Sequence, residues 1–394
     1  MQKTILRTVL ILAAVLVPLG AWMRHALDAT RAPHIPTPKL TIGAYASPRT
    51  VADATTWRHF LARADTTVLN AVVLELMSPA GVHFRGDSRL ARKIAAPAAL
   101  RYDLEDRVAE AHAHHLFVIG LVDVSRNPRL AREKPKWTLR TRGGHPWRDG
   151  SGRTSLDVSN DDVCGFVADI ARQAARAGVD EIMLDELRLP SAAGGAPLLR
   201  ADAEHPAYRA IAECARAVGG SVRRAGARLG VAVPAAVCTD VSPGGVEGQR
   251  WEDLVLAADR ISPEVYPSAL RGSAGQPASA QPYAAVSAAV GLCYTRNLRV
   301  IRDLGGKPVR VARIEPWIQA YSTRGWSVGP VALGEELRAL REHGVGNALL
   351  WNGASDYDRF VPALRRGMAG RVVAYNPTAA EWARANQAPQ GIGD

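Results

Sequence analysis

Motifs that mark many common functional sites are missing from this chain of 394 residues. It contains only four cysteines, which lie far apart in the sequence and form no Cys-x-x-Cys pair or Cys/His cluster: Cys164, Cys214, Cys238 and Cys293. That spacing argues against a structural zinc site. We expect buried free thiols, with disulfide formation as the alternative if the chain is exported.

The chain also lacks the motifs of nucleotide-binding and nucleic-acid-binding proteins. No Gly-rich phosphate loop follows the first predicted strand, which counts against a nucleotide-binding fold. Arginine carries most of the formal net charge of +11, but it is scattered, and no nucleic-acid motif accompanies it. We interpret this charge as a solvated surface, with attraction to an anionic polymer as the alternative. We predict no nucleic-acid partner, no cofactor and no metal site.

The N-terminal region has the pattern of a targeting segment. Lys3 and Arg7 precede an apolar run over residues 9–23, as a charged n-region precedes an h-region. The run is short for a membrane span, and the cleavage site within it at Leu19-Gly20-Ala21 is mediocre, so cleavage and membrane tethering both remain open. We predict a signal peptide or signal anchor over residues 1–29 and a proline-rich linker over residues 30–39. The barrel would then be periplasmic, extracellular or anchored to the inner membrane.

After the linker, strand-like and helix-like segments alternate, which is typical of an α/β fold with a parallel sheet. The predicted strands cover residues 41–45, 71–76, 116–122, 182–184, 229–233, 260–267, 309–315 and 347–351. Eight such units predict a single (β/α)8 TIM-type barrel with enlarged loops over residues 40–372, followed by a C-terminal tail over residues 373–394. An open, doubly wound sheet is the alternative.

The stretch over residues 179–190 organises the rest of the prediction. Its apolar core, Ile182 to Leu184, is too short for a helix and indicates a buried parallel strand, which Asp185, Glu186 and Arg188 follow. In a parallel barrel, chemistry takes place at this end of the strands. The alternative is structural, with an acidic residue that caps the next helix or pairs with Arg188.

Polar and aromatic side chains gather at the predicted strand ends along the whole chain. They are Glu75, Asp123, Asp185, Arg188, Asp240, Glu264, Tyr266, Glu315, Trp317, Gln319, Trp351 and Asn352. Cleavage of a glycosidic bond needs one carboxylic acid to protonate the leaving oxygen and a second carboxylate to attack or to activate water. Burial and like-charge crowding keep the acid protonated. As alternatives, several carboxylates could pair with arginines such as Arg188 and Arg313, or bind a divalent cation.

Six segments in order carry a resemblance that runs from about Leu40 to Phe360. They cover residues 69–75, 147–152, 178–190, 261–268, 315–319 and 349–352. The chain resembles a bacterial family of glycoside hydrolases, first described as a domain of unknown function, with a (β/α)8 barrel of the glycosidase superfamily. Three sites depart from the family pattern. The family's second strand usually ends in Asp followed by a Lys-Asp-Asp-like stretch, whereas here Glu75 is followed by Met77, Ser78 and Pro79. Glu264 stands where a Met is usual, and Glu315 where an Arg is usual. The resemblance therefore bears on the fold more than on the substrate.

Together these observations predict a glycoside hydrolase that acts on a cell-surface or extracellular polysaccharide or oligosaccharide. We expect Asp185 to be the nucleophile or base and Glu264 the proton donor, with Glu315 as its rival. The expected substrate-binding residues are Glu75, Asp123, Arg188, Tyr266, Trp317, Gln319, Trp351 and Asn352. The alternatives are a carbohydrate-binding barrel that has lost its acid–base pair and a metal-dependent esterase or deacetylase.

Overall fold

A computed structural model describes residues 34–141, 143–190, 206–240, 242, 245–270, 277–324 and 326–366. The predicted signal or anchor segment, part of the linker and the C-terminal tail lie outside these residues. Within them, no helix is both long enough and apolar enough to cross a membrane.

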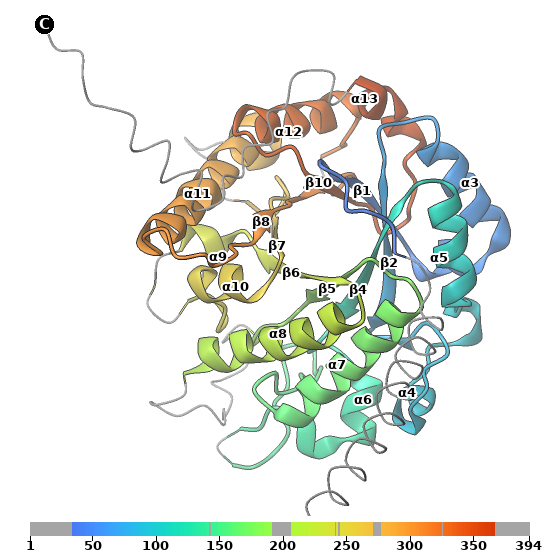
Figure 1. The fold of residues 1–394 in the computed structure, drawn as a ribbon, viewed down its shortest axis with the longest axis vertical. Coiled ribbons are helices and arrows are strands. Elements are labelled where there is room, and N and C mark those ends of the chain that lie inside the picture. Colours follow the sequence, from blue (N-terminus) through green and yellow to red (C-terminus); the bar gives the residue numbers. More distant parts are fainter. Residues whose placement is uncertain are drawn as a thin grey trace, which may run out of the picture.

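Eight parallel strand positions close into a barrel (Figure 1). They are β1 (Ile42–Ala46), β2 (Ala71–Ser78), β4 (Phe117–Asp123), β5 (Glu181–Asp185), β6 (Arg228–Pro234), β7 (Arg260–Glu264), β8 (Arg313–Ile314) with β9 (Trp317–Gln319), and β10 (Ala348–Trp351). Each pairs with the next, and β1 pairs in parallel with both β2 and β10. The predicted (β/α)8 barrel is confirmed and the open sheet is excluded. A short β3 (Gly81–Val82) forms an antiparallel hairpin with β2.

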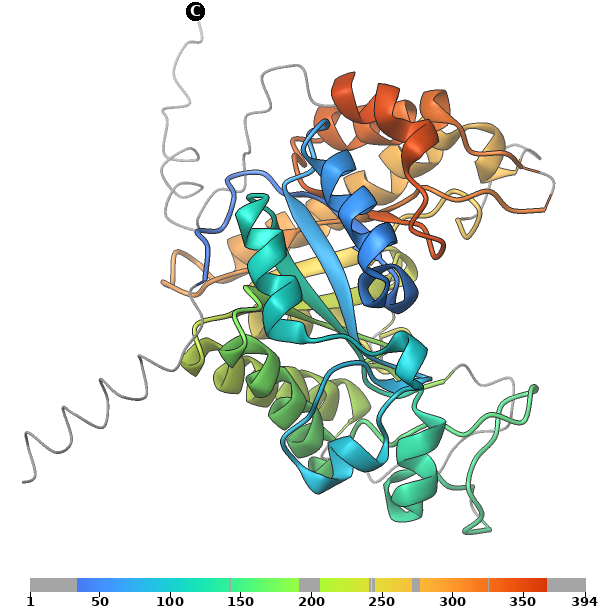
Figure 2. The same ribbon diagram turned by 90° about the vertical axis from the view of Figure 1, so that its right-hand side faces the viewer.

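Helices surround the barrel on its outer face (Figure 2). The longer ones are α3 (Ala54–Ala64), α5 (Leu104–Ala113), α7 (Asp161–Arg176), α8 (Ala207–Arg224), α10 (Trp251–Ala257), α11 (Pro282–Asp303) and α12 (Pro330–Glu342). Shorter ones are α2 (Pro48–Ala52), α4 (Arg89–Lys93), α6 (Pro128–Glu133), α9 (Ala236–Thr239) and α13 (Val361–Arg366), with 3-10 turns at Ala98–Leu100, Pro135–Trp137, Ala278–Ala280 and Asp358–Phe360.

Helix α7 shows how the local sequence sets these elements. Asn160 caps its N-terminus by accepting a hydrogen bond from the Asp162 N–H at 2.9 Å. Val163, Val167 and Ile170 recur at helical spacing and are fully buried against the sheet. Gly178, at φ +96°, then turns the chain into β5.

Strand starts are tied to their neighbours by a repeated device at the base of the barrel. Asn70, Asp180, Asp259 and Asn347 each precede a strand, and each accepts a hydrogen bond from a backbone N–H at the start of a neighbouring strand, at 2.8–3.0 Å. These N–H groups would otherwise be unpaired at the end of the ladder, where a buried orphan donor is costly. These hydrogen bonds thus help to fix the closure and the register of the sheet at the base of the barrel.

The strand period of two decides which side chains enter the barrel. In β5, Glu181, Met183 and Asp185 point inward, while Ile182 and Leu184 pack against the helices. Glu181 therefore lies at the base of the barrel interior and Asp185 at its opposite end, the mouth, where the strands terminate.

The seventh barrel strand differs from its prediction. It was expected at residues 309–315, but Val309 is exposed, and the strand consists of β8 and β9 with Pro316 between them. Proline has no N–H to donate to the ladder, so it interrupts the pairing without ending the strand. Glu315 consequently lies in the middle of this strand, inside the barrel, instead of at its end.

Arg260, at the inward-facing start of β7, is the centre of a buried ionic cluster. Its Nε lies 3.0 Å from Glu181 Oε2, a terminal nitrogen pairs with Glu315 Oε2, and another contact joins it to Thr41 Oγ1 at 2.8 Å. Glu181 and Glu315 are both fully buried. Gly230 leaves room for this arrangement, because a Cβ there would lie 2.6 Å from Glu181 Oε1.

The cysteines form two disulfides, so the expectation of free thiols is wrong. Cys164 of α7 bonds to Cys214 of α8, and Cys238 of α9 bonds to Cys293 of α11. The two bonded cysteines are 50 residues apart in sequence in the first disulfide and 55 in the second. Only the packing of neighbouring helices brings each pair within bonding distance, which sequence spacing does not reveal.

The Arg260 cluster yields a stability prediction. Replacing Arg260 with Ala leaves two fully buried carboxyl groups without their cation, which is expected to lower the free energy of unfolding by about 3–5 kcal/mol. Urea denaturation followed by tryptophan fluorescence measures this loss. The control is Arg310→Ala, which removes an exposed arginine that pairs with the buried Asp259 near the base. Its loss should cost less than about 1 kcal/mol, because Arg223 still pairs with Asp259 at 3.0 Å. Equal losses in the two variants would contradict a structural role for the cluster.

Candidate functional site

The inward-facing residues at the strand ends gather at the barrel mouth. They are Tyr45, Glu75, Asp123, Asp185, Glu264, Trp317 and Trp351. Asp123 and Asp185 are partners in the register of β4 and β5, so their Cα atoms are neighbours at a strand spacing of about 4.8 Å. Two carboxyl groups thus stand side by side, and the predicted gathering of Asp123, Asp185 and Glu264 at one face is what the strands produce.

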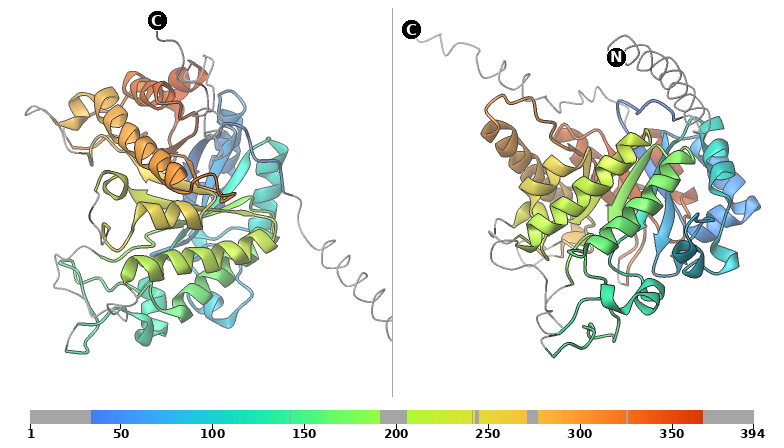
Figure 3. Two further views of the ribbon diagram at one scale, coloured as in Figure 1. Left: turned by 60° about the vertical axis from the view of Figure 1, so that its left-hand side comes forward. Right: turned by 60° about the horizontal axis from the view of Figure 1, so that its bottom comes forward.

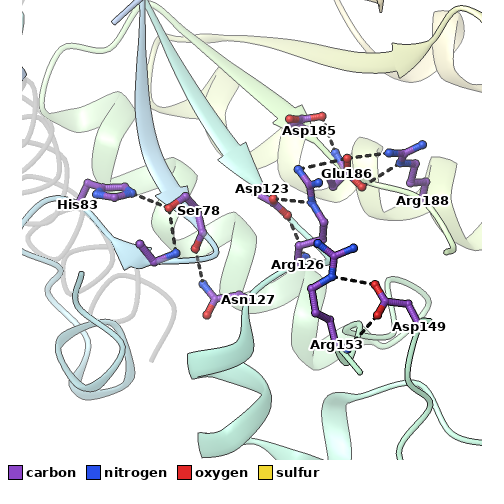
Figure 4. Close-up of polar contacts among 11 residues, drawn as sticks. Ser78, His83, Asp123, Arg126, Asn127, Asp149, Arg153, Asp185, Glu186 and Arg188 are labelled. Carbon is purple, nitrogen blue, oxygen red and sulfur yellow. Dashed lines mark hydrogen bonds and ion pairs between the residues drawn. The ribbon is translucent and has the colours of Figure 1, made fainter. Parts of the chain in front are cut away.

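Arg126 neutralises part of this charge. Its Nε donates to Asp123 Oδ2 at 3.1 Å, and its backbone N–H donates to Asp123 Oδ1 at 2.9 Å (Figure 4). A terminal nitrogen of Arg126 also lies 3.3 Å from Glu186 Oε1. Burial still raises the pKa of Asp123 well above its usual range, and the charge of Asp185 acts in the same direction.

The loop that carries Arg126 is held in place by Asn127 and Ser78. Asn127 Oδ1 accepts from the Leu130 N–H at 2.9 Å and so caps α6, while its Nδ2 donates to the Ser78 carbonyl at 3.2 Å. Ser78 Oγ lies 2.8 Å from the buried His83 Nε2, which fixes the turn after β2 (Figure 4). These contacts anchor the arginine beside the strand ends.

Asp185 sits at a tight turn that sends the next side chain away from the barrel. The Glu186 N–H donates to Asp185 Oδ1 at 2.8 Å, and Glu186 has a left-handed backbone with φ +52°, which is strained for a residue with a Cβ. Glu186 makes a two-pronged ion pair with Arg188, at 2.9 and 2.7 Å. Arg188 also contacts Glu247 at 2.6 Å. The neighbouring arginine is thus occupied by two glutamates, and Asp185 itself forms no direct ion pair among the described residues.

Two further carboxyl groups share the electrostatic environment of Asp185. Burial raises the pKa of Asp185, and the charge of Glu186 adds to this, while Arg126 opposes it. Burial raises the pKa of Glu264 to about 8, and the charge of Asp185 is the next largest cause. Burial raises the pKa of Glu75 to about 7, against a 2.8 Å hydrogen bond from the Tyr45 hydroxyl. At neutral pH, the mouth therefore holds carboxyl groups that keep their protons.

Aromatic rings line the same opening. The ring centroids of Tyr45 and Trp351 are 4.2 Å apart, and those of Trp317 and Trp351 are 5.6 Å apart. Trp351 and Tyr266 are partly exposed, whereas Trp317 is only 2% exposed. Trp317 therefore supports Trp351 edge-on and does not offer a ring face of its own, contrary to its predicted role in substrate binding.

Two other predicted site residues are engaged elsewhere. Gln319 is buried, with Oε1 accepting from the Ser268 N–H and Nε2 donating to the Tyr321 carbonyl. Asn352 donates to the carbonyls of Ala320 and Asp356 and accepts from the Ala354 N–H. Both amides thus fix loops instead of facing a substrate.

Glu315 does not reach the mouth. It is fully buried at the Arg260 cluster at the base of the barrel, because Pro316 interrupts the strand without ending it. The expectation that Glu315 is a rival proton donor is therefore wrong.

Residues that the sequence did not single out complete the site. Tyr45 binds Glu75, Arg126 bridges Asp123 and Glu186, and Glu247 holds Arg188. Tyr45 stands at a predicted strand end, and Arg126 follows Asp123 by three residues, so both positions could have been noticed. Glu247 lies in an irregular segment far along the chain and gave no signal.

Two hollows open beside these carboxyl groups. One, of about 450 Å³, has Glu264 in its wall and is otherwise lined largely by small apolar side chains of α9 and α11. The other, of about 500 Å³, is lined by Glu186, Glu247 and four arginines: Arg126, Arg148, Arg153 and Arg188. Across the ranges that the structure describes, no group of three or more His, Cys, Asp or Glu residues is arranged to hold a metal ion.

Comparisons with known proteins agree with this architecture. A family model described as "Putative glycosyl hydrolase domain" matches residues 43–357. The structure is similar to the PgaB (BpsB) glycoside hydrolase domain from Bordetella bronchiseptica, with a TM-score of 0.61 and 15% identity over 84% of this chain and 99% of that one. It is also similar to α-L-fucosidase isoenzyme 2 from Paenibacillus thiaminolyticus, with a TM-score of 0.54 and 15% identity over 86% and 50% of the two chains. No match was found among curated proteins.

The crowding of the mouth yields a prediction about Glu264. In wild type, its carboxyl group should titrate near pH 8. Asp185→Asn removes the neighbouring negative charge and should lower this pKa, although not to the ordinary value, because burial remains. Infrared difference spectroscopy of the chain labelled with ¹³C-glutamate follows the titration. Glu264→Gln identifies the band, and an unchanged pKa in the Asp185 variant would show that the two groups do not interact.

Proposed function

Because the chain belongs to the glycosyl hydrolase domain family, we propose that it is an exported glycoside hydrolase that cleaves a cell-surface or extracellular polysaccharide by a two-carboxylate mechanism. One observation carries this proposal. Asp185 and Glu264 end two strands at the same barrel mouth, and burial beside Asp185 raises the pKa of Glu264 to about 8. A carboxyl group that is still protonated at neutral pH can donate to a leaving oxygen.

The surroundings of the two groups support different roles for them. Asp185 lies near Arg126 and Arg188, and it accepts a hydrogen bond from the Glu186 N–H. All three interactions favour its carboxylate form, which suits a nucleophile or a base. Arg126 and Arg188 also lower the pKa of Glu264, but no hydrogen bond is among the causes that act on it. The pKa of Glu264 therefore stays raised, and its proton is retained. Glu264 would therefore protonate the glycosidic oxygen while Asp185 attacks the sugar or activates water.

The spacing of the strands is compatible with either stereochemical course. β5 and β7 are separated only by β6, which places their axes about 9–10 Å apart. Inward-pointing side chains shorten the distance between the carboxyl groups. Retaining pairs are about 5 Å apart and inverting pairs about 6.5–9.5 Å apart, so both remain within reach.

Substrate contacts are proposed for the partly exposed residues around this pair. Trp351 and Tyr266 offer ring faces for sugars. Glu75, with its bound Tyr45 hydroxyl, and Arg188 can bond to sugar hydroxyls. Asp123 is almost fully buried and tied to Arg126, so its contribution would be to hold that arginine in position.

Export is supported by two independent features. The charged and apolar N-terminal segment has the pattern of a signal peptide or anchor. The two disulfides, which use every cysteine of the chain, are typical of an oxidising compartment. We therefore propose that the barrel works in the periplasm or outside the cell, either released or tethered through residues 9–23.

The test of the proposed activity compares wild type with Asp185→Asn on a panel of neutral, acidic and amino-sugar polysaccharides. New reducing ends should appear with wild type and fall at least about 100-fold with the variant, because the attacking or activating carboxylate is lost. Asp303→Asn, which changes an exposed carboxylate on α11, should retain full activity. Binding of a polymer by wild type without any release would favour a carbohydrate-binding barrel instead.

Glu264→Gln separates the two roles in the same assay. It should be inactive on polymers but partly active on aryl glycosides, whose leaving groups need no proton.

Export yields its own prediction. The chain recovered from the envelope of producing cells should contain no thiol that iodoacetamide can alkylate, because both disulfides are formed there. The same chain without residues 1–29, produced in a reducing cytosol, should contain four such thiols. Because all four cysteines are buried, alkylation is carried out on the unfolded chain before reduction. Mass spectrometry counts the modified thiols, and alkylation after reduction validates the count. Free thiols in the envelope-derived chain would argue against an oxidising location.

A further inference from the structure

More than half of the net positive charge of the chain lies in one segment beside the mouth. Residues 124–160, which connect β4 to α7, contain nine Lys and Arg residues and three Asp and Glu residues, a net charge of +6 out of +11. The scattered distribution that the sequence suggested is therefore misleading. This segment includes α6 and a two-stranded projection held by bridges between Thr138 and Leu156 and between Arg140 and Pro146; it extends away from the barrel in Figure 3.

The larger of the two hollows, here called the arginine hollow, lies where this segment meets the barrel mouth. Arg126, Arg148 and Arg153 of the segment face Arg188 from the turn after β5, around a space of about 500 Å³. Three carboxylates, Asp149, Glu186 and Glu247, line the same space. Among the described lining residues, four guanidinium groups thus outnumber three carboxylates, and this part of the lining is net positive.

The internal ion pairs leave some hydrogen-bond donors of these arginines available. Arg153 donates its Nε to Asp149 at 2.8 Å, yet its side chain is 72% exposed. Arg126 pairs with Asp123 and Glu186 and is 50% exposed. Arg148 is exposed and donates to the Gly152 carbonyl at 2.6 Å, with no carboxylate partner recorded among the described residues. A planar guanidinium carries five donors, so each group can bind its internal partner and a ligand.

The hollow is close to the reacting carboxyl groups. Glu186 lines the hollow and directly follows Asp185. Its backbone N–H donates a hydrogen bond to Asp185 Oδ1. Arg126 lies near enough to influence the pKa of both Asp185 and Glu264. Among the described residues that line the hollow beside Glu264 there is no arginine, and this lining is largely apolar. The two sides of the mouth therefore differ in charge.

We propose that the arginine hollow binds a negatively charged substituent of the sugar chain, a carboxylate or a sulfate, next to the bond that is cleaved. The substrate would then be an anionic polysaccharide. Guanidinium groups match planar oxyanions with paired hydrogen bonds, which makes arginine more selective for them than a general positive charge. This inference rests on the proposed function for its substrate, but the binding of the anion can be measured without turnover.

The test uses the full chain with Asp185→Asn, so that a bound polymer is not cleaved. Binding is measured by calorimetry for three matched pairs: polygalacturonate against its methyl ester, hyaluronan against its carboxyl-reduced form, and dextran sulfate against dextran. We expect at least one anionic polymer to bind about tenfold more tightly than its neutral partner. The pair that shows the preference distinguishes carboxylate from sulfate.

Two double variants separate the hollow from general charge. Arg148→Gln with Arg153→Gln should abolish the preference for the anionic polymer. Arg58→Gln with Arg302→Gln removes the same charge from exposed positions on α3 and α11 and should change binding by less than about twofold. Unchanged melting temperatures show that all the variants fold.

The outcomes are distinguishable from those of the activity assay. Equal binding within all three pairs, or equal losses in the two double variants, would overturn the inference and leave the hydrolase proposal standing. Selective anion binding by a wild-type chain that cleaves no polymer would refute the hydrolase and retain the hollow as an anion site.

Discussion

A closed parallel ladder makes the last inward position of each strand share one small opening with its neighbours. In this barrel those positions carry Glu75, Asp123, Asp185 and Glu264, and the β4–β5 register sets two of the four side by side. So many carboxylates cannot all ionise in a poorly solvated space at neutral pH. Protonation of some groups and the charges of Arg126 and Arg188 resolve the conflict, which leaves protonated and ionised carboxyl groups close together, as the proposed mechanism requires.

The same residue types have a different role at the other end of the barrel. Glu181, Arg260 and Glu315 form a closed ionic cluster between interior strand positions, and it lies away from solvent. The two buried carboxyl groups are tolerated there because they share the cation of Arg260. At the mouth, the arginines are partly exposed and the carboxyl groups are left partly unpaired. Buried carboxyl groups that pair with an arginine away from solvent stabilise the fold, whereas buried carboxyl groups without an ion pair at an open mouth suit acid–base chemistry.

The surroundings of the site are built to hold this imbalance. Asn127 and Ser78 anchor Arg126, Glu247 holds Arg188, and the left-handed turn at Glu186 separates its side chain from that of Asp185. One disulfide joins α7 to α8, the helices that precede and follow β5 in the chain. Rigid support of this kind keeps like charges close together when they would otherwise move apart.

The sequence by itself determined the order and type of the main elements. Apolar strand cores such as Ile182 to Leu184 and the helical spacing in α7 have local causes, and eight repeats of them imply a barrel. Asp185 and Glu264 could be named because strand ends of a barrel share one face. Tertiary structure decided everything that depends on distant partners. The strand continues past Pro316, so Glu315 lies in the Arg260 cluster and not at a strand end. Gln319 and Asn352 form hydrogen bonds with the backbone. The packing of neighbouring helices brings the cysteines together in pairs. It also gathered Arg148, Arg153 and Arg188 around one hollow, because Coulomb interactions depend on distance in space and not on separation along the chain.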